Sequence, residues 1–323
     1  MIKIKVLIPD KLNKEAVKIL EEAGFDVVNK PGISEKELIE ICEDCDAMIV
    51  RSGVDITKDV IKAAKNLKLV VRAGVGFDNI DTATAAEYSI VVENTPFGNI
   101  NAAAEHTLTL LMMLSKHVMH STIELKGGVW DRKKYEATEL KGKTLGIIGL
   151  GNVGKKVAKV ALALEMNVLS FDPYIDMATM KKMGIVKANF EDIVKKSDYI
   201  TVHVPLNNKT KDLISEKEFE MMKTGVKIIN VARGEIINEE ALEKAILSGK
   251  VAAAALDVYK EEPPICQSLL IHDKVICTPH LGASTKEAQI NVAVDAANQI
   301  IAALRNGKIE NCVNGIKELR KTY

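Results

Sequence analysis

The feature that most constrains the fold of this 323-residue chain is a glycine-rich turn between a strand-like and a helix-like run. Residues 144–149 (TLGIIG) form a continuous apolar strip, which predicts a strand covered on both faces. Residues 155–166 (KKVAKVALALEM) predict the helix that follows. Between them, Gly149, Gly151 and Gly154 form a G-x-G-x-x-G pattern. In this context the pattern indicates a turn that cradles a pyrophosphate at a helix N-terminus.

The three glycines of this turn have different predicted roles. Gly149 permits the tight turn, Gly151 lets the backbone approach the phosphates, and Gly154 lets helix and strand pack closely. The next predicted strand ends in Asp172, an acid that can bind ribose hydroxyls and repel a 2′-phosphate, which favours NAD over NADP. The alternative is a turn that binds nothing, with Asp172 as a solvated acid. The order and spacing of these elements favour the dinucleotide site.

Strand-like and helix-like segments alternate along the chain, which predicts an α/β protein with two Rossmann-like domains built on doubly wound parallel sheets. The predicted strands are 3–8, 47–51, 69–74, 90–94, 144–149, 167–172, 199–204, 227–232 and 275–279, and the long helical stretches are 99–128 and 284–307. We expect residues 98–284 to form the NAD-binding domain. Residues 1–97 and 285–323 would form a smaller, discontinuous domain of the flavodoxin-like type.

Composition excludes several classes of protein. Lys and Arg total 44, and so do Asp and Glu, so there is no basic excess of the kind that favours nucleic acid or a membrane surface. No apolar run approaches the ~20 residues that span a bilayer. The five scattered cysteines suit a reducing cytosol, so we expect a cytoplasmic protein. Cys42 and Cys45 form a C-x-x-C, but no second pair completes a site, and we expect no metal.

Three side-chain types that serve hydride transfer from a secondary alcohol follow predicted strands. Arg233 follows strand 227–232, and its guanidinium can bind a carboxylate in a planar fork. A surface salt bridge is an equal alternative from position alone. His280 follows strand 275–279, and an imidazole can take and return a proton near neutral pH. A loop histidine with only structural hydrogen bonds is the alternative.

A carboxylate near the histidine would favour its imidazolium form and orient the ring. Glu261 and Glu262 are adjacent, and spacing alone leaves both open. Most loop carboxylates simply face water. The residues themselves therefore predict a possible acid/base pair without deciding its acidic member.

Several motifs together resemble the D-isomer-specific 2-hydroxyacid dehydrogenases. They are GLGNVG with Asp172, VARGEIINEEAL (231–242), ALDVYKEEP (255–263) and TPHLGASTKEAQ (278–289). The motifs VRSGVDIT (50–57), VVRAGVGFDNID (70–81), ENTPFGNINAAAEHT (93–107) and WDRKKYEATELKGKTLGIIG (130–149) are similar to the branch that acts on 3-phospho-D-glycerate. The similarity covers nearly the whole chain, in the family's order.

The resemblance implies a role for each candidate. Arg233 would bind the substrate's carboxylate and carbonyl oxygen, and His280 would be the acid/base, paired with Glu262 rather than Glu261. With the glycine turn, NAD would be bound by Asn152, Val153, Asp172, Val204, Pro205, Ala232, Arg233, Asp257, His280 and Gly282. The substrate, a small anionic 2-hydroxy or 2-keto acid, would also be bound by Arg51, Ser52, Gly74, Val75, Gly76, Arg132 and Lys133, the last two possibly across a homodimer interface.

The implied reaction is the NAD-dependent oxidation of 3-phospho-D-glycerate to 3-phosphohydroxypyruvate, the first step of the phosphorylated route to serine. A glyoxylate or hydroxypyruvate reductase, or another D-2-hydroxyacid dehydrogenase, is an alternative. An NAD-sensing binding protein of the corepressor type is a further one. Many members of this branch carry C-terminal serine-binding domains. The sequence ends at Tyr323, so serine feedback through such a domain is not expected. Val75 stands where relatives often have a hydroxyl side chain, which leaves backbone or apolar contacts there.

Overall fold

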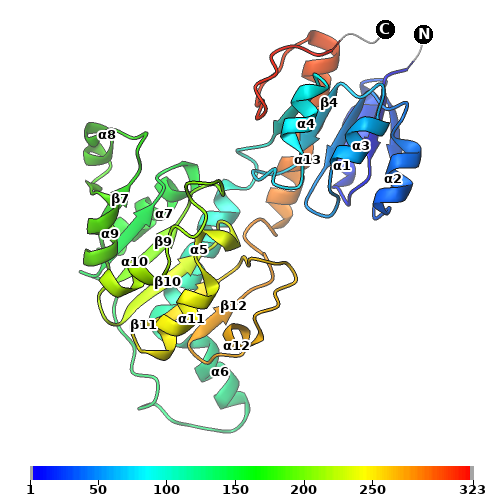
Figure 1. The fold of residues 1–323 in the computed structure, drawn as a ribbon. Coiled ribbons are helices and arrows are strands. Elements are labelled where there is room, and N and C mark those ends of the chain that lie inside the picture. The colour runs from blue at the N-terminus through cyan, green and yellow to red at the C-terminus, as the bar shows by residue number, and fades with distance from the viewer. Residues whose placement is uncertain (1–2, 321–323) are drawn as a thin grey trace. The chain divides into compact units, whose positions relative to one another are not determined.

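The computed structural model describes residues 3–320, which form two parallel sheets, each within its own unit (Figure 1). The discontinuous unit contains the described residues up to Ile100 and those from Thr285 onward. The continuous unit contains Asn101–Ser284. The chain therefore passes between the units twice, just before and just after the continuous one.

The discontinuous unit has a five-stranded sheet in the order β2-β1-β3-β4-β5, which is the order of a flavodoxin-like sheet, the type expected for this domain. Its strands are β1 (Lys5–Ile8), β2 (Asp26–Asn29), β3 (Ala47–Val50), β4 (Leu69–Arg72) and β5 (Val91–Asn94). Its helices are α1 (Lys14–Glu22), α2 (Glu35–Ile41), α3 (Lys58–Ala63), α4 (Thr82–Glu87) and α13 (Lys286–Asn306). Helices cover both faces, because all five strands are parallel and each crossover needs a helix.

Helices α1 and α13 pack on one face of this sheet, and α2, α3 and α4 pack on the other. The side of α13 that meets the sheet is rich in alanine, which lets the long helix lie close to the strands. Its first turn is capped by the Thr285 side chain, which accepts from the Ala288 N–H, and it ends at Gly307 in the left-handed conformation. Beyond α13, the Val313 N–H donates to the Val92 carbonyl, so this segment of the chain covers part of the edge strand β5.

The continuous unit has a seven-stranded parallel sheet in the order β12-β11-β10-β9-β6-β7-β8. Its strands are β6 (Thr144–Ile148), β7 (Asn167–Phe171), β8 (Val186–Lys187), β9 (Tyr199–Val202), β10 (Val226–Asn230), β11 (Val251–Leu256) and β12 (Val275–Cys277). Six of them repeat the order of a dinucleotide-binding sheet, with β6 at the point where the order reverses. The first strand of the unit therefore lies inside its sheet, between β9 and β7.

Two helical layers enclose this second sheet. Its helices are α5 (Ile100–Lys116), α6 (Val118–Lys126), α7 (Asn152–Ala163), α8 (Met177–Lys182), α9 (Phe190–Lys196), α10 (Glu216–Met221), the 3₁₀ turn η1 (Gly234–Ile236), α11 (Glu239–Leu247) and α12 (Gln267–Leu270). Helices α5, α7 and α8 share a buried cluster with one face, and α9 to α12 share another with the opposite face. None of the helices described has both the length and the apolar character that crossing a membrane would need.

Three strands were not among those predicted from the sequence. β2 and β8 are short and mostly exposed, so they lack the buried apolar run that was used as the signal. β11 reads VAAAAL, and alanine favours helix when it is considered alone. It forms a strand here because it lies between β10 and β12 and is covered on both faces. Small side chains fill that narrow space.

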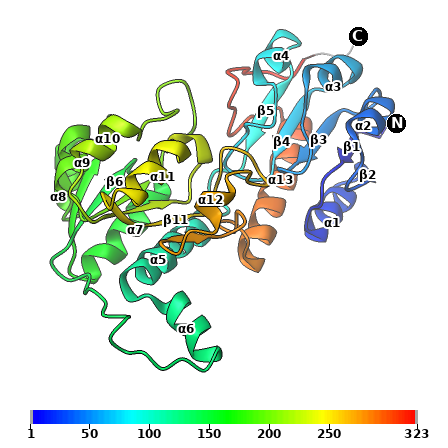
Figure 2. The same ribbon diagram turned by 60° about the horizontal axis from the view of Figure 1, so that its bottom comes forward.

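The single long helix expected over 99–128 is wrong. The structure has α5 and α6 instead, with a break at His117, whose φ of 53° is in the left-handed region. Both views show α6 and the segment after it extending away from the sheet of this unit (Figures 1 and 2). The pattern of apolar residues continues across the break, which is why the sequence suggested one helix.

Candidate active site

The cofactor-site residues predicted from the sequence lie at or just beyond the carboxyl ends of strands in the continuous unit. Gly149–Gly154 follow β6 and Asp172 follows β7, whereas Val204 and Pro205 follow β9. Ala232 and Arg233 follow β10, Asp257 follows β11, and His280 and Gly282 follow β12. Because all seven strands are parallel, these positions share one edge of the sheet. This edge is where open α/β sheets bind ligands.

The three glycines of the turn differ in how much space surrounds a Cβ placed on them. A Cβ on Gly149, whose φ is 93°, would lie 2.5 Å from the His203 carbonyl oxygen. A Cβ on Gly154 would lie 2.3 Å from the Gly149 carbonyl oxygen. At Gly151, by contrast, a Cβ would meet nothing within 4 Å. Two glycines therefore permit packing inside the protein, and the third leaves the backbone open at the start of α7.

Asp172 is buried, and backbone N–H groups orient it. Its Oδ2 accepts from the Leu150 N–H at 2.8 Å, and its Oδ1 accepts from the Tyr174 N–H at 2.8 Å. Asn152 and Val153 form the first turn of α7, where backbone N–H groups have no helical partner. The open backbone at Gly151, the helix start and the fixed carboxylate are the donor and acceptor set that a dinucleotide needs, so these residues fit NAD.

The acid/base candidate and a carboxylate lie in contact at this edge. His280 Nδ1 is 2.6 Å from Glu262 Oε2, so the hydrogen-bonded partner is Glu262 and not Glu261. Burial raises the pKa of Glu262, but its hydrogen bond with His280, the charge of that ring, the Tyr259 N–H and the charge of Arg233 outweigh burial. The pKa of Glu262 therefore lies below its ordinary value of 4.5, which keeps the group ionised.

The backbone at Arg233 is held by Asn230, the last residue of β10. The Asn230 side chain is buried, donates to the Arg233 carbonyl at 2.8 Å and accepts from the Ala232 N–H at 3.0 Å. A Cβ on Gly234 would lie 1.9 Å from the carbonyl carbon of Tyr259, so the backbone after Arg233 lies directly on the loop that leads to Glu262. The guanidinium and the carboxylate are close enough for the charge of Arg233 to lower the pKa of Glu262.

Asp257 is fully buried and holds the loop that carries His280. Its Oδ1 accepts from the Leu281 N–H and its Oδ2 from the Gly282 N–H, both at 2.7 Å. Its carbonyl accepts from the His280 N–H at 2.9 Å. A Cβ on Gly282 would lie 3.1 Å from Asp257 Oδ2, so the loop approaches the carboxylate closely. His280 itself has a φ of 52°, a conformation that histidine adopts more often than most residues.

In the discontinuous unit, Asp10 orders the loop after β3. Its Oδ2 accepts from the Arg51 N–H at 3.0 Å and from the Gly53 N–H at 2.9 Å, with Ser52 between them. The Asn79 side chain donates to the Arg51 carbonyl at 2.7 Å. The predicted phosphate-binding loop therefore has a fixed backbone at the carboxyl edge of its own sheet.

Gly74, Val75 and Gly76 follow β4 at the same edge. Gly74 has a φ of 154°, and a Cβ there would lie 1.7 Å from an Arg72 guanidinium nitrogen. The Asn94 side chain donates to the Val75 carbonyl at 2.6 Å, and the Val75 side chain is 41% exposed. The loop thus presents backbone and an apolar side chain, as the sequence indicated for position 75.

Arg132 and Lys133 do not join Arg233 within the continuous unit. Both are exposed on the segment after α6, and the next two residues, Lys134 and Tyr135, line a cavity of about 620 Å³. The same cavity is lined by residues of the amino-terminal ends of β11 and β12, such as Ala252 and Lys274. This is the edge of the sheet opposite to His280. Within the continuous unit, this segment therefore does not bring Arg132 and Lys133 to the edge that carries His280.

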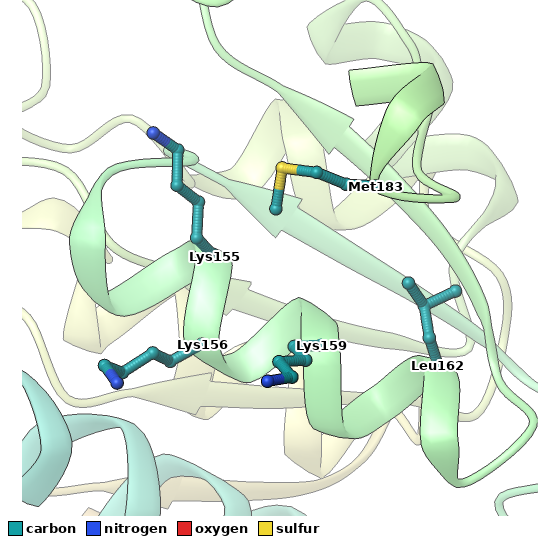
Figure 3. Close-up of a pocket in the computed structure, with 5 residues that line it drawn as sticks. All are labelled: Lys155, Lys156, Lys159, Leu162 and Met183. Atoms are coloured by element: carbon teal, nitrogen blue, oxygen red, sulfur yellow. The ribbon is translucent and has the colours of Figure 1, made fainter. Parts of the chain in front are cut away.

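A second cavity, of about 390 Å³, lies along the outside of α7 (Figure 3). It is lined by Lys155, Lys156, Lys159, Leu162 and Met183. In Figure 3 the Lys156 and Lys159 side chains point away from Leu162 and Met183. None of the residues predicted to bind NAD lines it, so the cavity is a groove between α7 and the end of α8 and not the cofactor site.

The remaining candidate, the C-x-x-C, is buried. Burial raises the pKa of the Cys42 thiol to about 11 and that of Cys45 to about 12, which disfavours their reactive thiolate forms. Within residues 3–320, no group of three or more His, Cys, Asp or Glu side chains is placed to hold a metal ion.

Three residues that hold parts of the candidate site were not singled out from the sequence: Asp10, Asn230 and His106. Asp10 and Asn230 had a signal, because each is a polar residue at or just beyond the end of an apolar strand. His106 lies in the second turn of α5 and hydrogen-bonds to Asp257 and Thr278. Nothing in its local sequence indicates that contact, which joins segments far apart in the chain.

Comparisons with known proteins give matches for both the sequence and the fold. The family model "D-isomer specific 2-hydroxyacid dehydrogenase, NAD binding domain" matches residues 108–282. The sequence is 45% identical over 312 residues, 96% of the chain, to a D-3-phosphoglycerate dehydrogenase of Methanocaldococcus jannaschii. The chain spans 59% of that relative's length.

Solved structures show the same fold over nearly the whole chain. A glyoxylate reductase from Paecilomyes thermophila matches with a TM-score of 0.90 and 28% identity, covering 97% of this chain and 99% of that one. The D-lactate dehydrogenase from Aquifex aeolicus complexed with NAD and lactic acid matches with a TM-score of 0.84 and 27% identity, covering 96% and 99%.

Proposed function

The chain belongs to the D-isomer-specific 2-hydroxyacid dehydrogenase family and contains its NAD-binding domain, and from this premise we propose that it oxidises 3-phospho-D-glycerate to 3-phosphohydroxypyruvate. This would be the first step of the phosphorylated route to serine, in the cytoplasm. The proposal is supported by the 45% identity to a relative named D-3-phosphoglycerate dehydrogenase. It is a proposal about the whole protein, since the chain covers 59% of that relative's length.

The contact that carries this proposal is the 2.6 Å hydrogen bond between His280 Nδ1 and Glu262 Oε2, beside Arg233. His280 takes the proton from the C2 hydroxyl through its other ring nitrogen, because Nδ1 is engaged by Glu262. Glu262 holds the ring orientation and favours the protonated product of that step. Arg233 binds the substrate carboxylate and polarises the oxygen on C2.

The proposed NAD site takes part in the reaction at the same carbon atom of the substrate, C2. When bound, NAD supplies the acceptor for the hydride that leaves C2. The start of α7 would hold the pyrophosphate, and Asp172, whose carboxylate is fixed by the Leu150 N–H, would bind the adenosine ribose. Val204, Pro205 and Ala232 would line the nicotinamide end. Asp257 and Gly282 fix the loop on which His280 lies.

Phosphate recognition is proposed for Arg51, Arg132 and Lys133, with Ser52 beside Arg51. Gly74–Gly76 would bind the carboxylate through backbone N–H groups. Arg132 and Lys133 are remote from His280 in their own unit, so they would act from a second copy in a homodimer. Large exposed apolar side chains on α6 and the segment after it support such an interface: Val118, Ile123, Leu125, Val129 and Trp130.

A keto-acid panel with NADH tests the proposal. The reductive direction is used because the equilibrium of such couples favours the hydroxy acid. We expect 3-phosphohydroxypyruvate to have the highest kcat/KM. Arg51→Gln and Arg132→Gln should each lower that value about 10- to 100-fold, the worth of one charge-assisted contact, and change hydroxypyruvate turnover little. Lys18→Gln, at an exposed position on α1, is the matched control. Equal losses on both substrates would refute phosphate recognition by these residues.

A second candidate is a glyoxylate or hydroxypyruvate reductase. It is favoured by the structural match to a glyoxylate reductase with a TM-score of 0.90 and 28% identity. The same panel separates the two candidates, because this second enzyme would reduce glyoxylate or hydroxypyruvate better than the phosphorylated acid. The Arg51 and Arg132 variants would then have no selective effect.

A further inference from the structure

The side chains of His106, Asp257 and Thr278 form a hydrogen-bonded cluster within the continuous unit, next to the loop that carries His280. His106 Nε2 is 3.2 Å from Asp257 Oδ1 and 3.1 Å from Thr278 Oγ1. The Thr278 hydroxyl donates to the same Asp257 oxygen at 2.6 Å. The His106 side chain is 18% exposed and that of Asp257 is fully buried. The cluster joins α5 to strand ends more than 150 residues later in the chain.

The chemistry of these groups assigns the hydrogens. The carboxylate of Asp257 can only accept, and the Thr278 hydroxyl already donates to it. His106 Nε2 faces two acceptors, the carboxylate oxygen and the remaining lone pair of the hydroxyl. It must therefore carry a hydrogen and donate to both. Burial raises the pKa of Asp257, but the bonds from His106, Thr278, Leu281 and Gly282 outweigh burial and lower it.

Asp257 transmits this contact to the acid/base candidate. Its carboxylate accepts from the N–H groups of Leu281 and Gly282, and its carbonyl accepts from the N–H of His280. With the Thr278 hydroxyl, Asp257 binds four of the five residues from 278 to 282. A shift of this carboxylate therefore changes the backbone on which the His280 ring is mounted.

We propose that His106 is a positioning residue for His280. By donating to both Asp257 and Thr278 it holds residues 278–282 in the backbone conformation that brings the His280 ring to Glu262. The inference rests on the proposed function for its kinetic consequence. Its structural consequence, a more mobile loop when His106 is lost, does not depend on any reaction.

His106 is not assigned as an acid or base itself. Its Nε2 is engaged by two groups that belong to the protein, and its side chain is mostly buried. A histidine that served only the stability of α5 would lower the melting temperature without a selective effect on kcat. A positioning residue lowers kcat more than it weakens cofactor binding, because the reacting geometry depends on the loop.

Three variants separate these roles. His106→Ala removes the donor, and His106→Gln restores a donor, its side-chain amide N–H, that can face the same acceptors. Thr278→Val keeps the shape but removes the hydroxyl, and it remains informative if His106→Ala folds poorly. Glu105→Gln, exposed one residue away on α5, is the matched control. All are made in the full chain and compared by kcat, KM, NADH binding from fluorescence, and amide hydrogen exchange of the peptide covering 278–284.

We expect His106→Ala to lower kcat about 10- to 100-fold, the worth of a hydrogen bond to a charged group, with NADH affinity within about twofold of wild type. His106→Gln should recover most of the loss. The effects of His106→Ala and Thr278→Val should be less than additive when combined, since both act on Asp257. Exchange at 278–284 should accelerate in His106→Ala and not in Glu105→Gln.

The inference is overturned if wild type turns over a 2-hydroxy acid and His106→Ala matches Glu105→Gln in kcat. It is also overturned if His106→Gln is as impaired as His106→Ala. If wild type turns over no 2-hydroxy or 2-keto acid, the proposed function fails separately. Hydrogen exchange then decides alone: acceleration at 278–284 in His106→Ala supports the inference, and unchanged exchange refutes it.

Discussion

Both units place a buried aspartate at the carboxyl edge of their sheet, but the two groups organise different kinds of loop. Asp10 accepts from the backbone N–H groups of Lys11, Arg51 and Gly53, and it orders the turn that carries Arg51. Asp257 accepts from backbone, from a hydroxyl and from the His106 ring, and orders the loop that carries His280. An aspartate at a strand end thus orders the loop of an arginine in one unit and the loop of the acid/base candidate in the other.

The difference shows how much support each function requires. Arginine is charged at all relevant pH values, so a loop that presents it needs only a fixed backbone. A proton-transferring ring must keep one nitrogen engaged and the other aimed at the reacting group. The Asp257 loop is accordingly tied to β11, to α5 and, through Glu262, to the segment after Tyr259.

The largest expected effect falls on the acid/base candidate itself, His280. His280→Ala should lower kcat roughly 10²–10⁴-fold, the usual worth of a positioned acid/base, while NADH still binds. The measurement is steady-state reduction of the keto acid with NADH fluorescence titration in parallel. His272→Ala, a loop histidine before β12, is the control. Unchanged turnover in His280→Ala would remove the ring from the mechanism.

The two aspartates themselves sharpen the comparison. Asp257→Asn keeps the size but loses charge and one acceptor, and we expect kcat to fall about 10- to 100-fold. Asp10→Asn should instead raise KM for the phosphorylated acid several-fold and leave kcat near wild type, because it disturbs only the Arg51 turn. If both variants changed kcat and KM in the same way, the proposed difference between the Asp10 loop and the Asp257 loop would be wrong.

Cofactor choice provides a smaller effect within the continuous unit. Asp172→Ala should weaken NAD about tenfold, because the ribose hydroxyls lose their acceptor, and should improve the use of NADP relative to NAD. The measurement is kcat/KM for each dinucleotide. Asp176→Ala, at the cap of α8, serves as control. A constant NAD/NADP ratio would show that Asp172 does not select the cofactor.

The smallest effect concerns stability and pH. The pKa of Glu262 lies below its ordinary 4.5 in the fold, so the group stabilises the protein above the unfolded pKa. That stabilisation is lost as the pH falls through the folded pKa. Glu262→Gln should therefore lower the free energy of unfolding at neutral pH, and the difference from wild type should shrink below about pH 4.5. Urea unfolding across that range measures it, and a difference independent of pH would contradict the assignment.

The sequence predicted the sheet of each unit from particular runs. The run TLGIIG contains β6 (Thr144–Ile148), an interior strand of its sheet, and the glycine turn after it opens α7 as expected. VAAAAL was missed, because alanine carries little strand signal until neighbours cover both of its faces. The break at His117 was missed because the apolar pattern continues through it.

The site residues also divide into those that the sequence pattern could predict and those that it could not. Arg233 and His280 were found because each directly follows an apolar strand, and the carboxyl ends of parallel strands converge. Spacing could not choose between Glu261 and Glu262, since adjacent loop residues differ only in direction. The phosphate contacts of Arg51, Arg132 and Lys133 stay predictions.

By itself, this sequence determined the α/β class, the dinucleotide turn and the strand ends at which the chemistry is proposed. These depend on periodicity, on glycine positions and on the order of elements, all of which are local. Only the tertiary structure decided that His106 reaches Asp257 and that Gly234 lies against Tyr259, and it showed the contact between His280 and Glu262 that the family resemblance had implied but spacing had left open. Such contacts join residues far apart in the chain or depend on the direction of a single side chain, and local patterns contain neither.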